Sequence, residues 1–596
     1  MRQILVELRG DAPVSDQMAE VRHAWQSGRF NSLLIHIFSG LPDESRLAGI
    51  ARELKDGFET AVVVGTMSAG EIRDGRLMAQ GILVSAMLFE EARVRLLRFD
   101  GVMGREAQIG GAIRRALDAA ADIRAAELLF PGTEMDTQPL FAEISRCDPE
   151  IQIFGGYTGG HGLNSRDHFV FDSEGVTYDS ILAVIYAGRS LHIDVDKSIG
   201  WDALGMPFKV TKAHGKHLME LDGKPAAQIY EKFLKIDRKN HNNAEDASEF
   251  PLIVRQGQDE RLRSTVHIEE DGSLTLHGFV NEGMDLYLSC GNPTNIVETV
   301  NRRLEAMRRF KPQAILLYSC MVRKSFWEDF VDMEMEPFAR IASTAGFHTW
   351  GEILRDGRSG DLIEHNITLL SIGLREGDAP AGELPESRVD DTVLQGQASL
   401  IKHMTRLVFT TMGELQKAHS DLSALNQKLT VMAEHDALTG LYNRGKMELL
   451  IDDALDRSAD RGGVTSLVMM DLDRFKRIND TYGHDAGDDT LRHTAALLNT
   501  SIEGWPGAQI GRWGGEEFFT LLPDVDEDGA MRYAAQLSAA FNAHSFPEIG
   551  RVTCSQGVIT VRNCRDYRLI YNQVDNALYK AKKTGRNRIV QADSID

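Results

Sequence analysis

Short apolar runs alternate with amphipathic stretches along the first 375 residues of the chain. Residues 32–38, 60–64, 181–187 and 367–374 are four such runs, and each has the length and the β-prone composition of a buried strand. The stretches between the runs are helical in pattern. Because strands that alternate with helices are typical of layered folds, the pattern predicts an α/β or α+β architecture for this region.

Two glycine clusters, at residues 65–72 and 155–162, interrupt this pattern. Glycine accepts a positive φ and allows another backbone or a ligand to come close. Neither cluster is followed by the pattern of a dinucleotide-binding fingerprint. The clusters therefore predict tight turns between strands, with loops that contact a ligand as the alternative.

The chain changes character after the last of these runs. Residues 376–398 lack apolar periodicity and have the composition of a linker. A heptad repeat follows in residues 399–435. One row of positions spaced seven apart contains Ile401, Val408, Leu415, Leu422 and Leu429, and the other contains Met404, Thr411, Ala418, Leu425 and Met432. The repeat predicts a parallel coiled coil of two chains, and the alternative is a helix that packs on its own domain.

The composition is that of a globular protein, with 42% hydrophobic and 26% charged residues and a formal net charge of -22. An acidic surface repels phosphate backbones, so we expect no nucleic-acid partner, although one nucleotide pocket stays compatible with it. The five cysteines have the spacing of neither a zinc site nor a disulfide framework. Early charges at the N-terminus and the lack of an apolar run of about 20 residues predict no signal peptide and no membrane span, and hence a cytoplasmic protein.

Acidic residues follow directly on the apolar run 464–470, which predicts a buried strand. At its exit, Asp471 and the carbonyl oxygen of Leu472 are well placed to bind a hard divalent cation. Further along, Gly514 and Gly515 precede a β-prone run and predict a tight hairpin. Glu516 leaves that hairpin and can share a metal ion with Asp471. Two carboxylates from adjacent strands are a recurring way to hold Mg²⁺ against a triphosphate.

Four motifs occur in order in the C-terminal part of the chain. They are DALTGLYNR at 436–444, DLDRFKRINDTYGHDAGD at 471–488, GGEEF at 514–518 and DNALYKAKKTGRNR at 575–588. Together they resemble the GGDEF domain of diguanylate cyclases. For residues 436–596 the resemblance implies a sheet flanked by helices, related to the nucleotidyl-cyclase and polymerase palm (ferredoxin-like) domains. It also implies the condensation of two GTP molecules into cyclic di-GMP with release of pyrophosphate.

The same resemblance implies a role for each matching residue. Asp471, the carbonyl of Leu472 and Glu516 would bind Mg²⁺ or Mn²⁺, with Glu516 also acting as the general base. Lys476 would stabilise the charge that develops on the phosphates. The expected GTP-binding residues are Phe475, Asn479, His484, Asp488, Gly514, Gly515, Lys582 and Arg586. Asn479 and Asp488 would read the guanine edge, whose N1–H and 2-amino group are both donors, while Lys582 and Arg586 would hold the outer phosphates.

Many relatives carry an Arg-x-x-Asp motif that binds the product and inhibits the enzyme. Trp505 and Ala508 occupy the corresponding positions in this chain. Neither side chain can pair with a phosphate or a guanine as arginine and aspartate do, so we expect no product-inhibition site.

Several N-terminal segments resemble the FIST domain, a sensory module of bacterial signalling proteins. They are VGTMSAGEI at 64–72, IFGG at 153–156, ILLYSC at 315–320, GFHTWGEI at 346–353 and NITLL at 366–370. The family divides into two parts, which we place at residues 25–220 and 221–375. The resemblance implies a small-molecule ligand of unknown identity. Haem is the lesser expectation, with His161 and His348 as candidate ligands, because a lone histidine near glycines is usually structural.

The leading hypothesis is a signal-regulated diguanylate cyclase that forms a homodimer through the heptad region and is controlled by a FIST ligand. One alternative is a non-catalytic GGDEF receptor for GTP or cyclic di-GMP. Such receptors typically lose the metal-binding carboxylates or the glycines, whereas this chain keeps Asp471, Glu516, Gly514 and Gly515. Another alternative is a FIST scaffold that docks partner proteins.

Overall fold

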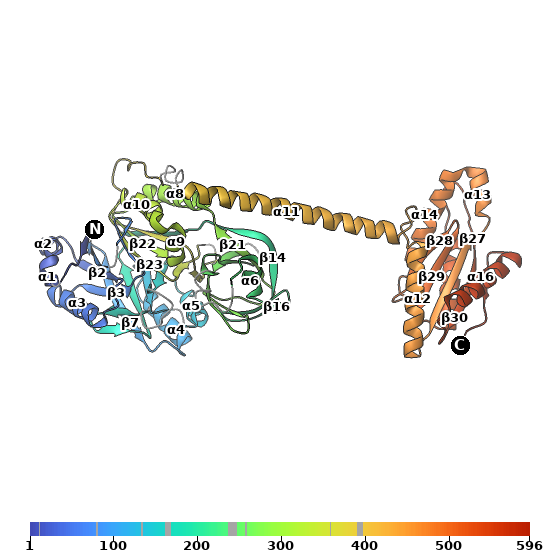
Figure 1. Cartoon of the computed structure of the whole chain (residues 1–596), viewed down its shortest axis with the longest axis horizontal. Coiled ribbons are helices and arrows are strands. Elements are labelled where there is room, and N and C mark those ends of the chain that lie inside the picture. The colour runs from blue at the N-terminus through green and yellow to red at the C-terminus, as the bar shows by residue number, and fades with distance from the viewer. Residues whose placement is uncertain are drawn as a thin grey trace. The chain divides into compact units, whose positions relative to one another are not determined.

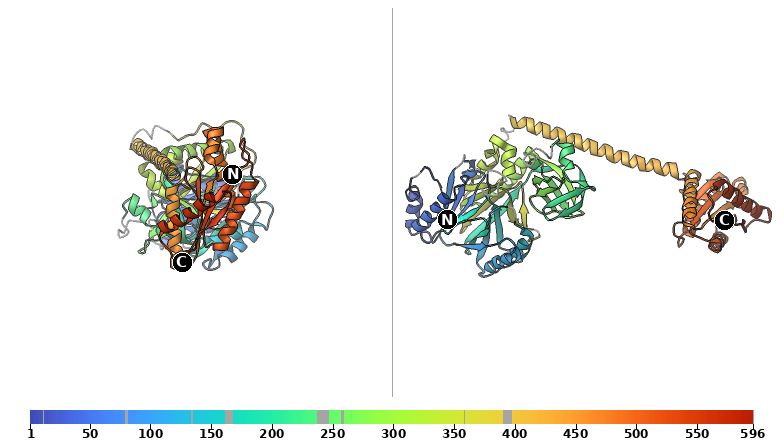
Figure 2. Two further views of the ribbon diagram at one scale, coloured as in Figure 1. Left: turned by 90° about the vertical axis from the view of Figure 1, so that its right-hand side faces the viewer. Right: turned by 60° about the horizontal axis from the view of Figure 1, so that its bottom comes forward.

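The computed structural model describes residues 1–595 except 11, 79–80, 133–134, 161–167, 237–246, 257–258, 358 and 390–396, and the side chains of 256, 259 and 397–402 also lie outside the description. Contacts within the chain divide it into two compact units, Met1–Gln416 and Lys417–Asp596. Figures 1 and 2 show the elements of both units, which are described separately below.

The described part of the N-terminal unit contains three six-stranded sheets, each built around a parallel pair of strands with a helical crossover. The pairs are β2 (Ser32–Ser39) with β3 (Val62–Met67), β8 (Ile123–Phe130) with β9 (Gln152–Tyr157), and β22 (Ala314–Cys320) with β23 (Thr344–Thr349). The crossover helices are α3 (Glu44–Gly57), α5 (Thr137–Ile144), and α9 (Met321–Trp327) with α10 (Asp332–Ala339). The first strand of each pair also has an antiparallel neighbour, namely β6 (Ile82–Phe89), β12 (Ser180–Ala187) and β26 (Leu369–Glu376). These mixed sheets confirm the predicted fold class.

The carboxylate of Glu127, on β8, connects strands of all three sheets. It accepts hydrogen bonds from Nε2 of His36 at 3.0 Å, from the hydroxyl of Tyr186 at 2.6 Å and from the hydroxyl of Tyr318 at 2.5 Å. Burial alone raises the pKa of Glu127, but His36 and the two hydroxyls outweigh burial and hold the pKa below its usual value. A fully buried carboxylate is tolerated here because its oxygens have these partners.

The glycine clusters lie partly within strands. The prediction of turns is wrong for Gly65, Gly155 and Gly156, whereas Gly70 lies in the bend between β3 and β4 (Glu71–Arg73), as predicted. Gly65 is on β3, and Gly155 and Gly156 are on β9. A Cβ on Gly155 would lie 1.9 Å from the carbonyl oxygen of Leu128 on the neighbouring strand. These glycines therefore allow close packing of the strands. The last two residues of the second cluster, 161 and 162, lie outside the described residues.

An antiparallel eight-stranded sheet follows the three mixed sheets, in the order β18-β17-β21-β14-β15-β20-β19 with β16 beside β15. Its strands are β14 (Trp201–His214), β15 (His217–Leu221), β16 (Lys224–Pro225), β17 (Leu252–Gln256), β18 (Asp259–Arg263), β19 (Thr265–Ile268), β20 (Leu274–Leu276) and β21 (Asp285–Gly291). Helix α8 (Pro293–Phe310) begins directly after β21, and the side chain of Asn292 caps it by accepting from the N–H of Thr294. From this capped start, α8 leads the chain from the antiparallel sheet to β22.

Residues 377–389 of the predicted linker contain neither helix nor strand, but they pack against the N-terminal unit. Ser387 and Val389 are buried. The N–H of Val389 donates to Oδ1 of Asn301 at 2.9 Å, and the hydroxyl of Ser387 donates to the carbonyl oxygen of Pro337. The described part of this segment is therefore attached to α8 and α10, which its composition did not predict.

Helix α11 (Gln397–Glu434) is continuous over 38 residues and covers the heptad region. Its apolar side chains are exposed, with Leu415 64%, Leu422 56%, Leu425 52% and Leu429 52% accessible. A helix that packs on its own domain stays the alternative. The coiled coil of two chains stays a prediction. No helix in the described part of the chain is long and apolar enough to cross a membrane.

The C-terminal unit is a five-stranded sheet in the order β28-β29-β27-β30-β31. The strands are β27 (Thr465–Leu472), β28 (Gln509–Gly514), β29 (Glu517–Pro523), β30 (Cys554–Val561) and β31 (Ile589–Gln591), and the helices are α12 (Arg444–Arg461), α13 (Phe475–Tyr482), α14 (His484–Ser501), α15 (Glu527–Ala543) and α16 (Tyr567–Lys583). Alternate residues of β27 enter two cores. Val468 and Met470 pack with α14 and α15, whereas Leu467 and Met469 pack with α12 and α16. Helices thus cover both faces of the sheet, and the central strand β27 ends beside the turn of the β28–β29 hairpin.

Candidate active site

The end of β27 and the turn of the β28–β29 hairpin lie side by side, because β27 and β29 are antiparallel neighbours. Gly514 ends β28, and Gly515 and Glu516 form the turn; Gly515 has a φ of +52°, which is strained for residues with a side chain. The N–H of Leu472 donates to the carbonyl oxygen of Glu516 at 3.3 Å. The fold therefore brings together the three predicted metal-binding residues, Asp471, Leu472 and Glu516.

Three carboxylates, those of Asp471, Glu516 and Glu517, gather at this point. Burial raises the pKa of each of them above its usual value, and repulsion from Asp471 raises the pKa of both glutamates further. Lys582 opposes this effect at Asp471, since its Nζ lies 2.6 Å from Oδ2. The site therefore holds an excess of negative charge in partly buried surroundings and favours a cation.

Glu517 was not among the predicted site residues. It lies opposite Asp471 in the β27–β29 ladder, and its pKa responds to both Asp471 and Lys582. In the sequence, the only sign of Glu517 was that it is the second glutamate of the GGEE segment. Its place beside Asp471 depends on the register of the β27–β29 ladder, which the sequence does not show.

The donor atoms fit a hard divalent cation such as Mg²⁺ or Mn²⁺. Carboxylate and carbonyl oxygens are the ligands that these ions prefer. Among the described residues, no group of three or more histidine, cysteine or acidic side chains forms a complete metal cage. Mg²⁺ commonly takes only one or two carboxylates and completes its coordination with water and substrate phosphates, so Asp471 and Glu516 suffice for such a site.

Comparison with protein families identifies the C-terminal unit. Residues 433–588 match the model of the diguanylate cyclase GGDEF domain. The C-terminal unit is a GGDEF domain. In the N-terminal unit, residues 33–224 match the FIST N domain and residues 226–355 match the FIST C domain. Both resemblances inferred from the motifs are thereby confirmed.

Curated relatives share the GGDEF region. Diguanylate cyclase DgcM of Escherichia coli K12 is 36% identical over 168 residues, which cover 28% of this chain and 40% of DgcM. Diguanylate cyclase DgcP of Pseudomonas aeruginosa is 36% identical over 174 residues, covering 29% of this chain and 25% of DgcP. The chain thus spans less than half the length of either relative. The active GGEEF domain of a diguanylate cyclase from Vibrio cholerae is 35% identical, covers 25% of this chain and 97% of that structure, and has a TM-score of 0.24.

Helices α13 and α14 of the GGDEF domain carry the predicted guanine-binding residues. Asn479 lies against Gly487, where a Cβ would be 1.9 Å from Oδ1 of Asn479. This close approach brings Asn479 near the backbone that carries Asp488. Phe475 is buried and packs at the same point, while Lys476 is exposed on the first turn of α13.

The remaining predicted nucleotide-binding residues differ in how closely the structure ties them to the carboxylates. Lys582 is ion-paired with Asp471, and the charge of Arg586 partly opposes the burial that raises the pKa of Asp471. His484 is exposed at the start of α14, with no recorded contact to the carboxylates. The structure therefore connects Lys582 and Arg586 to the metal-binding residues more directly than His484.

Trp505 and Ala508, at the positions of the inhibitory motif, belong to the packing of the domain. The ring of Trp505 meets that of Tyr533 edge-on with centroids 5.7 Å apart, and Ala508 is 8% exposed. Neither position offers a cation or a carboxylate at the surface. The absence of a product-inhibition site stays a prediction.

His348, one of the two candidate haem ligands, is fully buried on β23. Burial, together with the charge of Lys324, lowers its pKa to about 3, so the ring is neutral. Gly70 is packed so closely that a Cβ there would lie 3.3 Å from Cδ2 of His348. These surroundings fit a core residue rather than a haem ligand. His161, the other candidate, lies outside the described residues.

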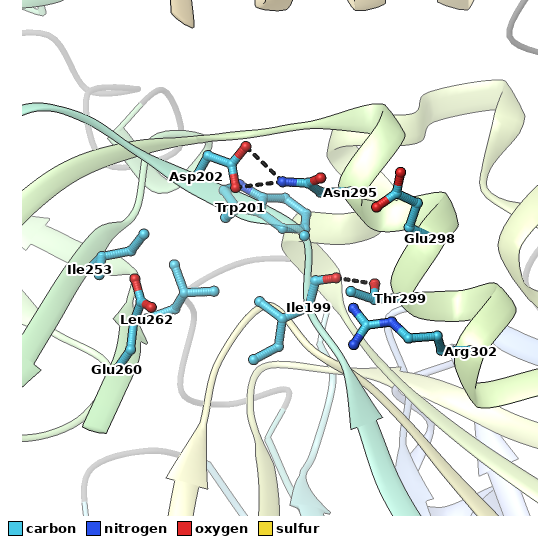
Figure 3. A pocket seen from close by; sticks show the side chains of 11 residues that line it. Ile199, Trp201, Asp202, Ile253, Glu260, Leu262, Asn295, Glu298, Thr299 and Arg302 are labelled. Carbon is cyan, nitrogen blue, oxygen red and sulfur yellow. Dashed lines mark hydrogen bonds between the residues drawn. The ribbon is translucent and has the colours of Figure 1, made fainter. Parts of the chain in front are cut away.

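A pocket of about 350 Å³ lies between α8 and the antiparallel sheet, and its lining comes from both the FIST N and the FIST C matches. Figure 3 shows its apolar floor, to which Trp201 contributes, and its charged rim. From α8, Glu298 and Arg302 contribute charges of opposite sign, and Glu260 contributes from β18. Trp201 is 5% exposed, and its Nε1–H has no hydrogen-bond partner among the described residues. The pocket therefore suits a small molecule that has both an apolar part and a charged or polar group.

In metal-free buffer at neutral pH, we expect Glu516→Gln to raise the unfolding temperature of the GGDEF domain by about 1–3 °C. The raised pKa means that the ionised carboxylate is less favourable in the folded than in the unfolded state, so Glu516 reduces stability, fully so above its folded pKa. As the pH falls below the folded pKa the difference should shrink, and it should vanish below the unfolded pKa. Differential scanning calorimetry of the full chain at several pH values measures this.

The matched control is Glu503→Gln, which removes an exposed glutamate from the segment after α14. It should leave the transition unchanged at every pH. Added Mg²⁺ should stabilise the wild-type domain more than the Glu516→Gln domain, because the variant loses a ligand. A lower unfolding temperature of Glu516→Gln in metal-free buffer would contradict the electrostatic account.

Proposed function

We propose that the chain is a diguanylate cyclase that condenses two GTP molecules into cyclic di-GMP and two pyrophosphates. The observation that carries this proposal is the convergence of Asp471, Glu516 and Lys582 at the end of β27, within a GGDEF domain. A pair of partly buried carboxylates with cations beside them suits a triphosphate with its metal ion.

Each residue would have the role in this reaction that the resemblance to the GGDEF domain implies. Asp471, the carbonyl of Leu472 and Glu516 would hold Mg²⁺ or Mn²⁺, which neutralises the triphosphate and lowers the pKa of the attacking 3′-hydroxyl when bound. Glu516 would accept the hydroxyl proton, as the resemblance to the GGDEF domain implies. Lys582 would exchange its contact with Asp471 for a contact with phosphate oxygens once the metal ion balances the carboxylate. Lys476 would stabilise the transition-state charge from the first turn of α13.

Guanine would be selected at the contact between α13 and α14. A carboxylate at Asp488 can accept from both N1–H and the 2-amino group, whereas adenine presents an acceptor at N1 and would meet repulsion. Asn479 would add an amide to the same edge. A site that forms hydrogen bonds with the polar edge of one base discriminates strongly against other bases, because those would leave protein groups without hydrogen-bond partners.

The full chain with Mg²⁺ should convert GTP, but not ATP, to the cyclic dinucleotide. Asp471→Asn should lower turnover at least about a hundredfold, because the amide is a poorer metal ligand and carries no charge. Asp489→Asn is the matched control, since Asp489 is exposed on α14 and its recorded partner is Arg492. Chromatographic product analysis measures turnover, and circular dichroism checks the fold.

The same experiment separates the enzyme from a non-catalytic receptor. Binding of GTP or cyclic di-GMP by the wild-type chain without product formation would favour the receptor. Turnover of Asp471→Asn equal to that of the control would remove Asp471 from the site.

We further propose that the active enzyme is a parallel dimer formed through α11. One GGDEF domain would bind one GTP, so bond formation requires two domains that face each other. The exposed apolar rows of α11, including Leu422 and Leu429, have the heptad spacing that a second helix covers. Because misplacement of about 1 Å can cost on the order of a hundredfold in rate, the register of this dimer would control activity.

Leu422→Glu combined with Leu429→Glu should yield a chain that still binds GTP but forms little product. Each glutamate would place an unpaired charge in the seam, which is costly. Activity should recover at high protein concentration. Ser420→Glu with Gln427→Glu is the matched control, because these positions add the same two charges to the outer face of the repeat. Sedimentation velocity reports the dimer. A fully active, dimeric Leu422→Glu/Leu429→Glu chain would refute dimerisation through α11.

Regulation by the FIST region forms the last part of the proposal. The pocket in Figure 3 has the size and the mixed lining of a small-molecule site. A ligand there would contact both the antiparallel sheet and α8, so it could change how these elements pack. The alternative, a docking scaffold, is favoured if no small molecule changes activity and a partner protein co-purifies.

A thermal-shift screen of small carboxylates and amines against the full chain should find compounds that stabilise the N-terminal unit and alter the rate of product formation. Arg302→Gln should abolish the shift of compounds bound in the pocket. Arg309→Gln is the matched control, because it removes an exposed arginine of the same helix outside the pocket. Equal shifts in both variants would place the ligand elsewhere.

A further inference from the structure

We propose that Asp473 is a positioning residue, whose carboxylate holds the turn that carries Arg586 against the strand end that carries Asp471. This inference rests on the proposed cyclase function. Asp473 is the second aspartate of the Asp471-Leu472-Asp473 segment, and the sequence pattern alone would allow it to be a third metal ligand.

The contacts of Asp473 give it a different role. Its carboxylate is 8% exposed and accepts three hydrogen bonds from neutral donors. Oδ1 accepts from the hydroxyl of Ser555 at 2.6 Å, and Oδ2 accepts from the hydroxyl of Thr553 at 2.7 Å and from the N–H of Asn587 at 2.9 Å. Both oxygens are thus engaged within the protein. Hydrogen bonds to an ionised acceptor are among the stronger ones in proteins, so this carboxylate is firmly placed.

The turn that Asp473 holds has an unfavourable backbone conformation. Gly585, Arg586 and Asn587 have φ values of +129°, +61° and +46° in succession. Positive φ is costly for residues with a side chain and persists only where surrounding interactions maintain it. The N–H of Arg586 donates to the carbonyl oxygen of Ala581 at 3.1 Å, and that of Asn587 donates to Asp473. Asp473 therefore maintains the turn together with Arg588, which donates to the carbonyl oxygen of Arg586, and Asn542, which bonds with the side chain of Asn587.

Asp473 in this way connects the two charged halves of the site, the strand end with Asp471 and the turn with Arg586. Its own backbone N–H donates to the carbonyl oxygen of Thr553 at 2.9 Å, which fixes the segment directly after β27. Its carboxylate fixes the start of β31 through Asn587. Arg586, proposed to hold the outer phosphates, lies between these attachments, so the distance from the metal-binding carboxylate to the guanidinium depends on Asp473.

The test is a double-mutant cycle with Arg586. Asp473→Asn keeps the size of the side chain but removes the charge and one acceptor, so the turn should loosen. We expect KM for GTP to rise on the order of tenfold with little change in kcat at saturating GTP. In the Arg586→Ala background, Asp473→Asn should add little, because its effect passes through Arg586. A residue that merely stabilises the fold would instead add its full effect in both backgrounds.

Thr553→Val is the matched control, since it removes another donor to the same carboxylate and leaves the bond to Asn587. Its effect on KM should be small. Asp473→Asn combined with Asn587→Gly should recover part of the affinity, because glycine adopts a positive φ without support. Additive effects in the cycle, or an unchanged KM in Asp473→Asn, would overturn the proposal.

Two further measurements keep the outcome decisive. In the wild-type full chain, hydrogen exchange should protect the Asn587 amide although its residue is exposed, and rapid exchange there would overturn the proposal even if Asp473→Asn does not fold. Calorimetric titration with GTP and Mg²⁺ reports affinity without turnover. A wild-type chain that binds GTP but forms no product would defeat the proposed function, while the same cycle, measured as GTP affinity, would still decide the role of Asp473.

Discussion

The ion pair between Asp471 and Lys582, at 2.6 Å, joins β27 to α16 at the point where the carboxylates gather. Its importance follows from the charge around it. Glu516 and Glu517 lie beside Asp471, and burial together with mutual repulsion makes their ionised forms unfavourable. Such an arrangement lowers the stability of the domain, and it is compensated only by positive charge. A protein selected for stability alone would replace these groups with neutral ones, which is a physical reason to interpret the cluster as functional.

Motif residues that are close in sequence could be predicted well. Asp471 and Leu472 end a strand, and Gly515 and Glu516 form a turn, so local pattern determined their surroundings. Residues whose role depends on long-range contacts could not be predicted. The partners of Asp473 lie 80 to 114 positions away. Nothing in the aspartate's own neighbourhood distinguishes a metal ligand from a residue that holds a distant turn.

The N-terminal unit shows the same limit. Its apolar runs predicted strands, and the alternation of these runs with helical stretches predicted a layered fold; both are present. The role of Gly65, Gly155 and Gly156 was predicted wrongly, because a glycine in a turn and a glycine under a neighbouring strand look alike in sequence. Gly155 is required by the carbonyl of Leu128, which is brought to it only by the parallel pairing of β8 and β9. Likewise, the buried Glu127 depends on donors from three separate sheets.

Any control of the GGDEF domain by α11 must pass through the segment that follows the helix, and this segment is attached to the catalytic hairpin. Arg512, on β28, donates from Nη1 to Oδ1 of Asp436 at 3.1 Å and from Nη2 to the carbonyl oxygen of Gly515 at 2.8 Å. The side chain of Asn443 donates back to the carbonyl oxygen of Ala433 near the end of α11. The end of the helix, the first motif of the domain and the turn that contains Glu516 are thus held by a continuous set of hydrogen bonds.

A rigid connection of this kind transmits a change in the position of α11 to the whole GGDEF domain, which then moves as a rigid body. Such a rigid-body motion suits the proposed reaction, because it changes the position of one GGDEF domain relative to the other. The residues within each domain are already brought together around Asp471 and need no rearrangement.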